Sequence, residues 1–248
     1  MTALGGVKAV VRSQDARLTL AWRALRQKVF LLRVRILASW ARSRVTINFA
    51  ADVRIGRGVR VHVWPGTETS LTFGPRSTIG DNVTFQLKGG EMVAGVQTHL
   101  RTNVVIQLGG RLLLDGENMI SYGCVLHCAE HVHIGYAALM GEYAAIVDSN
   151  HFHTTADAPV YENASTAPVE IGRNTFLGPR VSVGRGVTIG PWSVIGASSV
   201  VAKDIPAGVF ASGIPAVVVR DLEHPWMADI ALGDPGAPDP AWPAVLLT

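Results

Sequence analysis

The sequence predicts an all-β solenoid that carries an α-helical arm at its N-terminus. Three observations favour this architecture: a six-residue repeat between Ile171 and Pro206, helical periodicity over residues 15–45, and an apolar composition. Apolar residues make up 48% of the 248 residues and charged residues only 17%, against about 25% charged in an average soluble domain. Such a chain has enough core-forming side chains to fold, and it does not resemble a disordered protein.

The arm, residues 1–45, is basic and amphipathic. It holds ten Lys or Arg residues and one acid, Asp15, so its net charge is +9. Neither Gly nor Pro interrupts residues 15–45, and apolar residues recur there at spacings of three and four, which predicts a helix with one apolar stripe. The stripe consists of Leu18, Trp22, Leu25, Val29, Leu32, Ile36 and Trp40. Two interpretations stay open: a helix packed on its own domain or a partner subunit, and an interfacial helix on anionic lipid.

The repeat divides residues 171–206 into six consecutive hexads: IGRNTF, LGPRVS, VGRGVT, IGPWSV, IGASSV and VAKDIP. The first position is always a branched aliphatic residue, and the second is Gly, or Ala in the last hexad. One hexad suffices for a short strand and a turn, with the aliphatic side chain pointing inward and Gly where the backbone bends tightly. Such a unit buries its apolar face only by stacking in an array. Three hexads close a triangular coil, so this segment predicts two coils.

Upstream of this run the repeat is weaker. Residues 86–125 are apolar and rich in Gly but irregular in period, and we interpret them as further coils with bulges. The repeat stops over residues 150–170, a polar segment with two prolines that predicts a functional loop leaving the solenoid. A tail over 223–248, with five prolines, predicts no regular structure. The solenoid domain therefore spans 46–222. Its earlier hexads are marked by Ile55-Gly56, Ile79-Gly80, Ile134-Gly135, Met140-Gly141 and Ile146-Val147.

Charge and cysteine content exclude several classes of function. Residues 46–248 carry a net charge of −6, whereas a nucleic-acid-binding domain is typically basic, so no nucleic-acid partner is expected. Two cysteines, Cys124 and Cys128, cannot form a disulfide framework and are expected to be small buried residues. The N-terminus lacks the apolar core of a signal peptide, and no apolar run is long enough for a transmembrane helix. We expect a cytoplasmic protein, with contact at the inner face of the membrane left open.

The hexads, the closing segment VIGASSVVAKDIPAGVFASGIPAVVVRDL and the motif IVDSNH together resemble the hexapeptide-repeat acyltransferases. The likeness is to the sugar and polysaccharide O-acetyltransferases, and it covers residues 120–222 well and 46–119 loosely. The resemblance implies a left-handed parallel β-helix, acetyl-CoA as co-substrate, a homotrimer with sites between subunits, and a carbohydrate or glycolipid acceptor. It implies no metal cofactor.

The resemblance also suggests which residues form the site. His151 stands where galactoside acetyltransferases hold their catalytic histidine, and a pKa near 6.5 suits a general base acting on a hydroxyl. Asp148 could order the turn or orient the imidazole, and Glu162 lies near the spacing of a carboxylate that fixes this histidine. His153 is a candidate substrate contact. The residues implied at the CoA groove are Phe176, Gly178, Ala197, Ser198, Lys203 and Pro206, with Lys203 near a phosphate.

Two positions depart from the family pattern. Phe176 stands where relatives often have Trp, which keeps an apolar wall without the indole N–H. The substrate-contacting Asn of sugar acetyltransferases has no clear match, and Ser121 and Asn118 are the nearest candidates.

Three other functions compete with O-acetylation. The same site could acetylate the amine of an amino sugar, or the solenoid could be a non-catalytic scaffold whose helix binds a partner. A metal-dependent hydratase would need three convergent histidines, and the spacing typical of that group is absent. The sequence CxxHCxxH, formed by Cys124, His127, Cys128 and His131, has metal-ligand types, but neighbouring side chains in a strand alternate faces, so we expect no metal site there.

Overall fold

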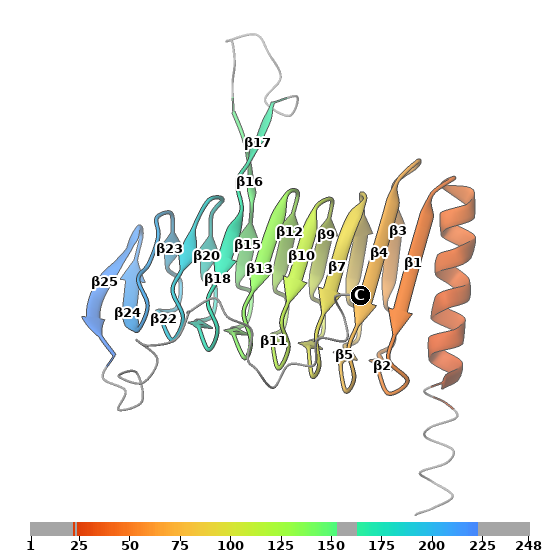
Figure 1. Ribbon diagram of the computed structural model, residues 1–248, viewed down its shortest axis with the longest axis horizontal. Helices are drawn as coiled ribbons and strands as arrows, with labels where there is room; N and C mark the ends of the chain where they lie inside the picture. Colours follow the sequence, from red (N-terminus) through yellow and green to blue (C-terminus); the bar gives the residue numbers. More distant parts are fainter. Residues whose placement is uncertain (1–21, 23, 153–162, 223–248) are drawn as a thin grey trace, which may run out of the picture.

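Each coil of the protein is built from three short parallel strands, and the coils stack into a β-helix with one helix across its N-terminal end (Figure 1). The computed structural model describes residues 22, 24–152 and 163–222. Between residues 44 and 201 every coil contributes one strand to each of three sheets, here named A, B and C, so the predicted left-handed parallel β-helix is confirmed.

Sheets A and C have seven strands each, and sheet B has nine. Sheet A contains β1 (Arg44–Phe49), β4 (Glu68–Phe73), β7 (Gly90–Ala94), β10 (Arg111–Leu114), β13 (His131–Ile134), β18 (Val169–Ile171) and β21 (Thr188–Ile189). Sheet B contains β2 (Arg54–Ile55), β5 (Thr78–Ile79), β8 (His99–Leu100), β11 (Met119–Ile120), β14 (Leu139–Met140), β19 (Phe176–Leu177), β22 (Val194–Ile195), β24 (Val209–Gly213) and β25 (Ala216–Asp221). Sheet C contains β3 (Arg60–Val63), β6 (Thr84–Leu87), β9 (Val105–Leu108), β12 (Val125–Cys128), β15 (Ala145–Val147), β20 (Ser182–Val183) and β23 (Val200–Val201). At the C-terminal end β24 extends sheet B, and β25 pairs with β24 antiparallel.

The coils shorten along the chain. From one strand of sheet A to its partner the chain advances 24 residues between β1 and β4, 21 between β4 and β7, 20 over the next two steps and 18 in the hexad coils. In the C-terminal part, Phe176 pairs with Val194, which lies three hexads further along the chain, so the predicted three hexads per coil are confirmed. In the middle of the chain the step is longer, as in the pairing of Arg111 with His131. The strand pairs there run without a register shift. The bulges predicted for residues 86–125 are therefore wrong: this segment is a regular repeat of a longer period.

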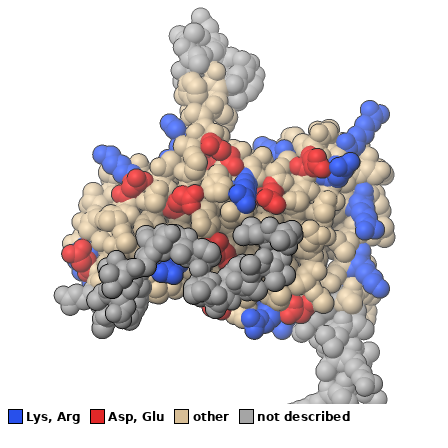
Figure 2. Space-filling view, in the orientation of Figure 1, with Lys and Arg blue, Asp and Glu red and all other residues tan. Residues whose placement is uncertain are grey.

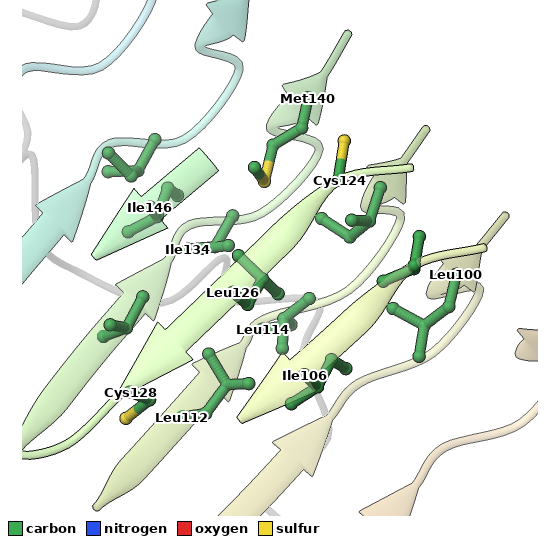
Figure 3. Close-up of a cluster of buried hydrophobic side chains, with 14 of the residues drawn as sticks. Leu100, Ile106, Leu112, Leu114, Cys124, Leu126, Cys128, Ile134, Met140 and Ile146 are labelled. Atoms are coloured by element: carbon green, nitrogen blue, oxygen red, sulfur yellow. The ribbon is translucent and has the colours of Figure 1, made fainter. Parts of the chain in front are cut away.

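The extra residues of the longer coils widen the core. The longer strands of sheets A and C point two side chains inward, as Leu112 and Leu114 do, whereas each hexad points one. Corner glycines allow these coils to close, because a Cβ on Gly110 would lie 2.2 Å from the carbonyl oxygen of Glu130 in the next coil. Figure 3 shows part of this core, in which both cysteines are completely buried among aliphatic side chains.

The helix covers the open end of the core. Its described residues, 22 and 24–40, bury Phe30, Val34 and Ala38. The Phe30 ring stacks on Phe49 of β1 with centroids 5.9 Å apart, and the amide of Gln27 donates to a carbonyl of the first coil. The helix thus packs on its own domain, as one of the two interpretations held, but through a different face from the predicted apolar stripe.

Candidate active site

A two-stranded hairpin leaves the solenoid where the coil size changes. After β15 the chain forms β16 (Ser149–His151), which pairs antiparallel with β17 (Ala164–Thr166). Figure 1 shows this hairpin projecting away from the stacked coils. The longer coils lie on its N-terminal side and the hexad coils on its C-terminal side. The predicted loop therefore begins as ordered strand pairing that holds His151 at a fixed place.

His151 is exposed at the end of β16, and its Nδ1 lies 3.2 Å from the backbone carbonyl oxygen of Asn163. A carbonyl oxygen only accepts hydrogen bonds, so Nδ1 is the protonated nitrogen of the neutral ring. The lone pair of that neutral ring then lies on Nε2. This tautomer is the one that a general base acting through Nε2 requires.

Asp148 lies at the root of the hairpin and is fully buried. Its carboxylate accepts the backbone N–H groups of Ala129, Glu130 and His131 at 2.7–3.0 Å. In the preceding coils such corner N–H groups donate to carbonyls of the next coil, as Arg111 does to Glu130. The chain leaves the solenoid at this point, so the Asp148 side chain replaces those carbonyls. Its observed contacts order the corner, which is one of the two roles expected for it.

A polar row on the outside of sheet C leads toward the hairpin. The register aligns Gln86 with Gln107 and Gln107 with His127, and the side chains of Gln107 and His127 are hydrogen-bonded through Nε2 of each. Burial lowers the pKa of His127, the charge of Asp148 opposes this shift, and the neighbouring Lys88 and His151 add to it. The neutral imidazole of His127 can both donate and accept a hydrogen bond.

Sequence reasoning missed this row. His127 entered it only as part of the CxxHCxxH pattern, and the two glutamines did not enter at all. The available signal was the recurrence of Gln86, Gln107 and His127 at nearly equal steps, each of which matches the coil length of this region.

The residues implied at the CoA groove lie in the hexad coils. Ala197 and Ser198 are exposed at the corner between sheets B and C, and the N–H of Ser198 donates to the carbonyl of Pro179. Gly178 lies under this corner, because a Cβ there would be 2.8 Å from the backbone nitrogen of Ala197. Lys203 is exposed just after β23. Gly178, Ala197 and Ser198 thus lie at the corner between sheets B and C, one sheet width from the hairpin. Lys203 lies at the corner between sheets C and A, from which the hairpin leaves two coils earlier.

The remaining two CoA candidates lie on different surfaces. Phe176 points outward from β19 with 38% of its surface exposed, in register with Leu139 and Val194. Pro206 is exposed, and its carbonyl accepts the buried hydroxyl of Ser193 at 2.7 Å.

The two candidates for the acceptor contact behave differently. Asn118 is fully buried, and its side chain bonds to the backbone of Gly116, Gly135 and Ala138. These bonds use its polar atoms to hold a corner and leave none facing the surface. Ser121 is nearly buried and donates to Glu142 at 3.0 Å. Glu162 and His153, the other candidates, lie outside the described residues.

The CxxHCxxH residues do not converge. Cys124 and Cys128 face the core, whereas His127 faces outward from sheet C and His131 outward from sheet A. Burial raises the pKa of the Cys124 thiol to about 11 and that of Cys128 to about 12. Neither thiol is therefore ionised at neutral pH, and neither is a nucleophile. Among the described residues no group of three or more His, Cys, Asp or Glu side chains is arranged to hold a metal.

Comparison with known proteins agrees with this repeat architecture. Residues 168–203 match the family model of the bacterial transferase hexapeptide, described as six repeats. Residues 168–203 thus carry the hexapeptide repeat of bacterial transferases. This hexapeptide-repeat chain is 30% identical over 180 residues to a protein of Mycobacterium tuberculosis named as a probable acetyltransferase, covering 72% of this chain and 53% of the relative.

A shorter stretch matches the galactoside O-acetyltransferase of Escherichia coli, with 51% identity over 55 residues, 22% of this chain and 27% of the relative. The hexapeptide-repeat chain thus spans about half or less of the length of these curated relatives. Among solved structures, a maltose O-acetyltransferase from Clostridium difficile 630 aligns with a TM-score of 0.43 and 22% identity, covering 68% of this chain and 69% of that one.

Proposed function

We propose that the protein transfers an acetyl group from acetyl-CoA to a sugar hydroxyl, with His151 as general base. The observation that carries the proposal is the Nδ1 contact of His151 with the Asn163 carbonyl, which leaves Nε2 ready to accept a proton. Similarity to named acetyltransferases, one of them a galactoside O-acetyltransferase, supports the reaction class.

The chemistry is a direct transfer. Nε2 of His151 takes the proton of the acceptor hydroxyl as its oxygen attacks the thioester carbonyl carbon. The tetrahedral intermediate then collapses, the carbon–sulfur bond breaks, and the imidazolium returns its proton to the leaving thiolate. Neither cysteine takes part, because the raised pKa values of Cys124 and Cys128 keep both thiols protonated. A backbone N–H would stabilise the oxyanion.

Acetyl-CoA would be held by the hexad coils. The corner formed by Ala197 and Ser198 gives an exposed edge, and Gly178 lets the backbone of that edge lie close to the coil beneath it. Lys203 supplies a positive charge for a phosphate group. Phe176 gives an apolar surface for the pantetheine chain.

The acceptor would lie along sheet C. Gln86, Gln107 and His127 form an outward row of amide and imidazole groups, the chemistry that hydrogen-bonds sugar hydroxyls. Adjacent strands lie about 4.8 Å apart, so these three side chains span roughly 10 Å. A row of this length fits an oligosaccharide better than a single sugar.

We propose that three copies assemble. One chain separates the hairpin from the CoA edge by the width of sheet C, so a second copy would complete the site. The outer row of sheet B offers an apolar contact face formed by Met119, Leu139, Phe176 and Val194. Light scattering should give a particle of three 26.4 kDa chains, and an active monomer would disprove this arrangement.

The test of the catalytic assignment compares His151→Ala with His99→Ala. Release of the CoA thiol from acetyl-CoA would be followed with a panel of mono- and oligosaccharides. We expect His151→Ala to lower kcat/KM about a hundredfold to ten-thousandfold, as removal of a general base does. His99 lies on sheet B, away from the hairpin, and its replacement should leave the rate unchanged.

Equal rates in the wild type and His151→Ala would refute His151 as the base. The product separates the competing functions: an O-acetyl ester is cleaved by hydroxylamine, whereas the amide of an N-acetylated amino sugar is stable. A scaffold would show no heat of CoA binding by calorimetry.

A further inference from the structure

The N-terminal helix carries a second apolar face that the solenoid does not use. Six large side chains on it are widely exposed, although Phe30, Val34 and Ala38 on the opposite side are buried. The exposed side chains are Trp22 (63%), Leu25 (49%), Val29 (49%), Leu32 (59%), Ile36 (46%) and Trp40 (84%). They are the described members of the stripe found in the sequence. A soluble monomer rarely leaves so contiguous an apolar row in water, so it marks an interaction surface.

Positive charges flank this row on both sides. At about 3.6 residues per turn, Arg26 and Arg33 fall along one edge of the row, and Lys28 and Arg35 along the other. All four side chains are exposed, and no Asp or Glu occurs between Trp22 and Phe49. An apolar row between two cationic rows, with Trp on the apolar side, is the pattern of a helix that lies in a membrane interface.

A groove beside the row also combines apolar side chains with arginines. It lies between the helix and the first coil, with a volume of about 410 Å³, and Trp22, Leu25 and Val29 form its apolar wall. Arg26, Arg33 and Arg57 also line it. Arginines at the rim of an apolar groove suit a phosphate headgroup with its acyl chain below.

The position of the helix permits this contact. It lies across the end of the solenoid, so its outer face points along the solenoid axis and away from every coil (Figure 1). Figure 2 shows Lys and Arg side chains gathered at this end of the molecule. A flat surface can therefore meet the whole face while the hairpin stays in water. Within the described residues no helix is long and apolar enough to cross a bilayer, so the helix would lie on the surface.

We propose that this face, formed by Trp22, Leu25, Val29, Leu32, Ile36 and Trp40 with their flanking arginines and Lys28, docks the protein on an anionic phospholipid surface. Two contributions act together. The apolar side chains leave water, and the cations are attracted to acidic headgroups, so binding requires anionic lipid and weakens with salt.

The test is sedimentation of the full chain with vesicles of phosphatidylcholine alone or with about a quarter phosphatidylglycerol. The variants are Leu32→Asp and Trp40→Asp, and the control is Val219→Asp on β25, whose exposure of 58% matches that of Leu32. We expect the wild type and the control to pellet with anionic vesicles at low salt and to be released at about 0.5 M salt. Each helix variant should bind at least roughly tenfold more weakly.

Two outcomes overturn the proposal. One is a wild type that stays in the supernatant or pellets equally with the two variants. The other is a helix variant that binds vesicles normally but loses its assembly in lipid-free light scattering, since the face would then contact a second copy. Acetyl transfer to a soluble sugar without vesicles is measured separately, so failure of lipid binding leaves the proposed reaction untouched.

Discussion

The coils before the hairpin and the coils after it stack into the same three sheets, but they contain different numbers of residues. After the hairpin, Glu170 pairs with Thr188, a step of three hexads, and the strands of sheets A and C are very short. Before it, longer steps, such as those from Arg44 to Glu68 and from Arg111 to His131, build longer strands in these two sheets. The longer strands point two or more side chains into the core, which accommodates larger groups such as Phe73. The shorter coils hold mainly Val and Ile.

This difference places the candidate site. The chain leaves the solenoid after β15, where steps of 20 residues give way to steps of three hexads. At this place, here called the seam, the backbone N–H groups of residues 129–131 do not meet carbonyls of the next coil. Asp148 satisfies the free N–H groups, and the hairpin carries His151 outward from the same point. The long coils then supply a polar outer row and the hexad coils an edge for CoA, so the two proposed substrates occupy the two kinds of coil.

The largest effect should follow loss of the carboxylate at the seam. Asp148→Ala removes the buried carboxylate that accepts three partly buried backbone N–H groups, and we expect it to lower the free energy of unfolding by about 3 kcal/mol. The matched control is Asp204→Ala within the hexad coils, where an exposed carboxylate accepts one N–H, that of Thr188, at 2.7 Å. Urea unfolding followed by circular dichroism gives both values.

Asp204→Ala should cost less than about 1 kcal/mol, because the freed N–H reaches water. If the two variants lost similar free energy of unfolding, the carboxylate at the seam would contribute no more to stability than one at an ordinary coil corner.

A smaller effect is expected on the KM values: a substitution in the long coils should change KM for the sugar, and one in the hexad coils should change KM for acetyl-CoA. Gln107→Leu removes a polar group from the long coils, and we expect it to raise KM for the sugar about three- to tenfold while KM for acetyl-CoA stays constant. Lys203→Ala removes a charge from the hexad coils and should raise KM for acetyl-CoA about tenfold with the sugar KM unchanged. Steady-state kinetics with each substrate varied in turn supply all four constants.

The reverse pattern, or a common change in both constants, would contradict the assignment of one substrate to each kind of coil. Circular dichroism spectra of both variants confirm that the coils remain folded.

The sequence predicted the hexad coils well and the long coils poorly, for a physical reason. A hexad coil has room for one inward side chain per strand, so the repeat shows as an aliphatic residue followed by Gly. A long coil has two or more inward side chains in the longer strands of sheets A and C but one in each two-residue strand of sheet B, and the steps between these coils vary from 24 to 20 residues. The inward residues therefore do not recur every six positions, and a six-residue repeat is not visible in the sequence.

The candidate site could also be predicted only in part. The motif IVDSNH led to His151, which the structure places on the projecting hairpin. The backbone contacts of Asp148 and Asn118 could not be predicted, because they depend on which N–H and carbonyl groups the neighbouring coil leaves free. The outer face of the helix was visible in the sequence as a stripe, yet periodicity alone cannot tell a packed stripe from an exposed one.

The smallest effect concerns pH and an ion-pair cluster across the seam. His133 of β13 contacts Asp115 of the preceding coil at 3.0 Å and Glu170 of the first hexad coil at 2.8 Å. His131 also contacts Glu170, at 3.2 Å. Hydrogen bonding to Asp115, followed by the charges of Asp115 and Glu170, raises the pKa of His133 against the opposing effect of burial.

A raised pKa means that the folded protein holds this proton more tightly than the unfolded chain, whose histidine pKa is about 6.5. The stabilisation is therefore complete below about pH 6.5 and is lost as the pH rises through the folded pKa of His133. His133→Gln keeps hydrogen-bonding groups but cannot be charged, so the wild type should exceed it in stability by about 1 kcal/mol or less in mild acid. This gap should close in mild alkali. The difference between the two proteins, measured by urea unfolding at each pH, cancels the titration of His99 and His127, whose pKa values burial lowers. A gap that stays constant with pH would mean that the long and hexad coils are joined at this seam by packing rather than by charge.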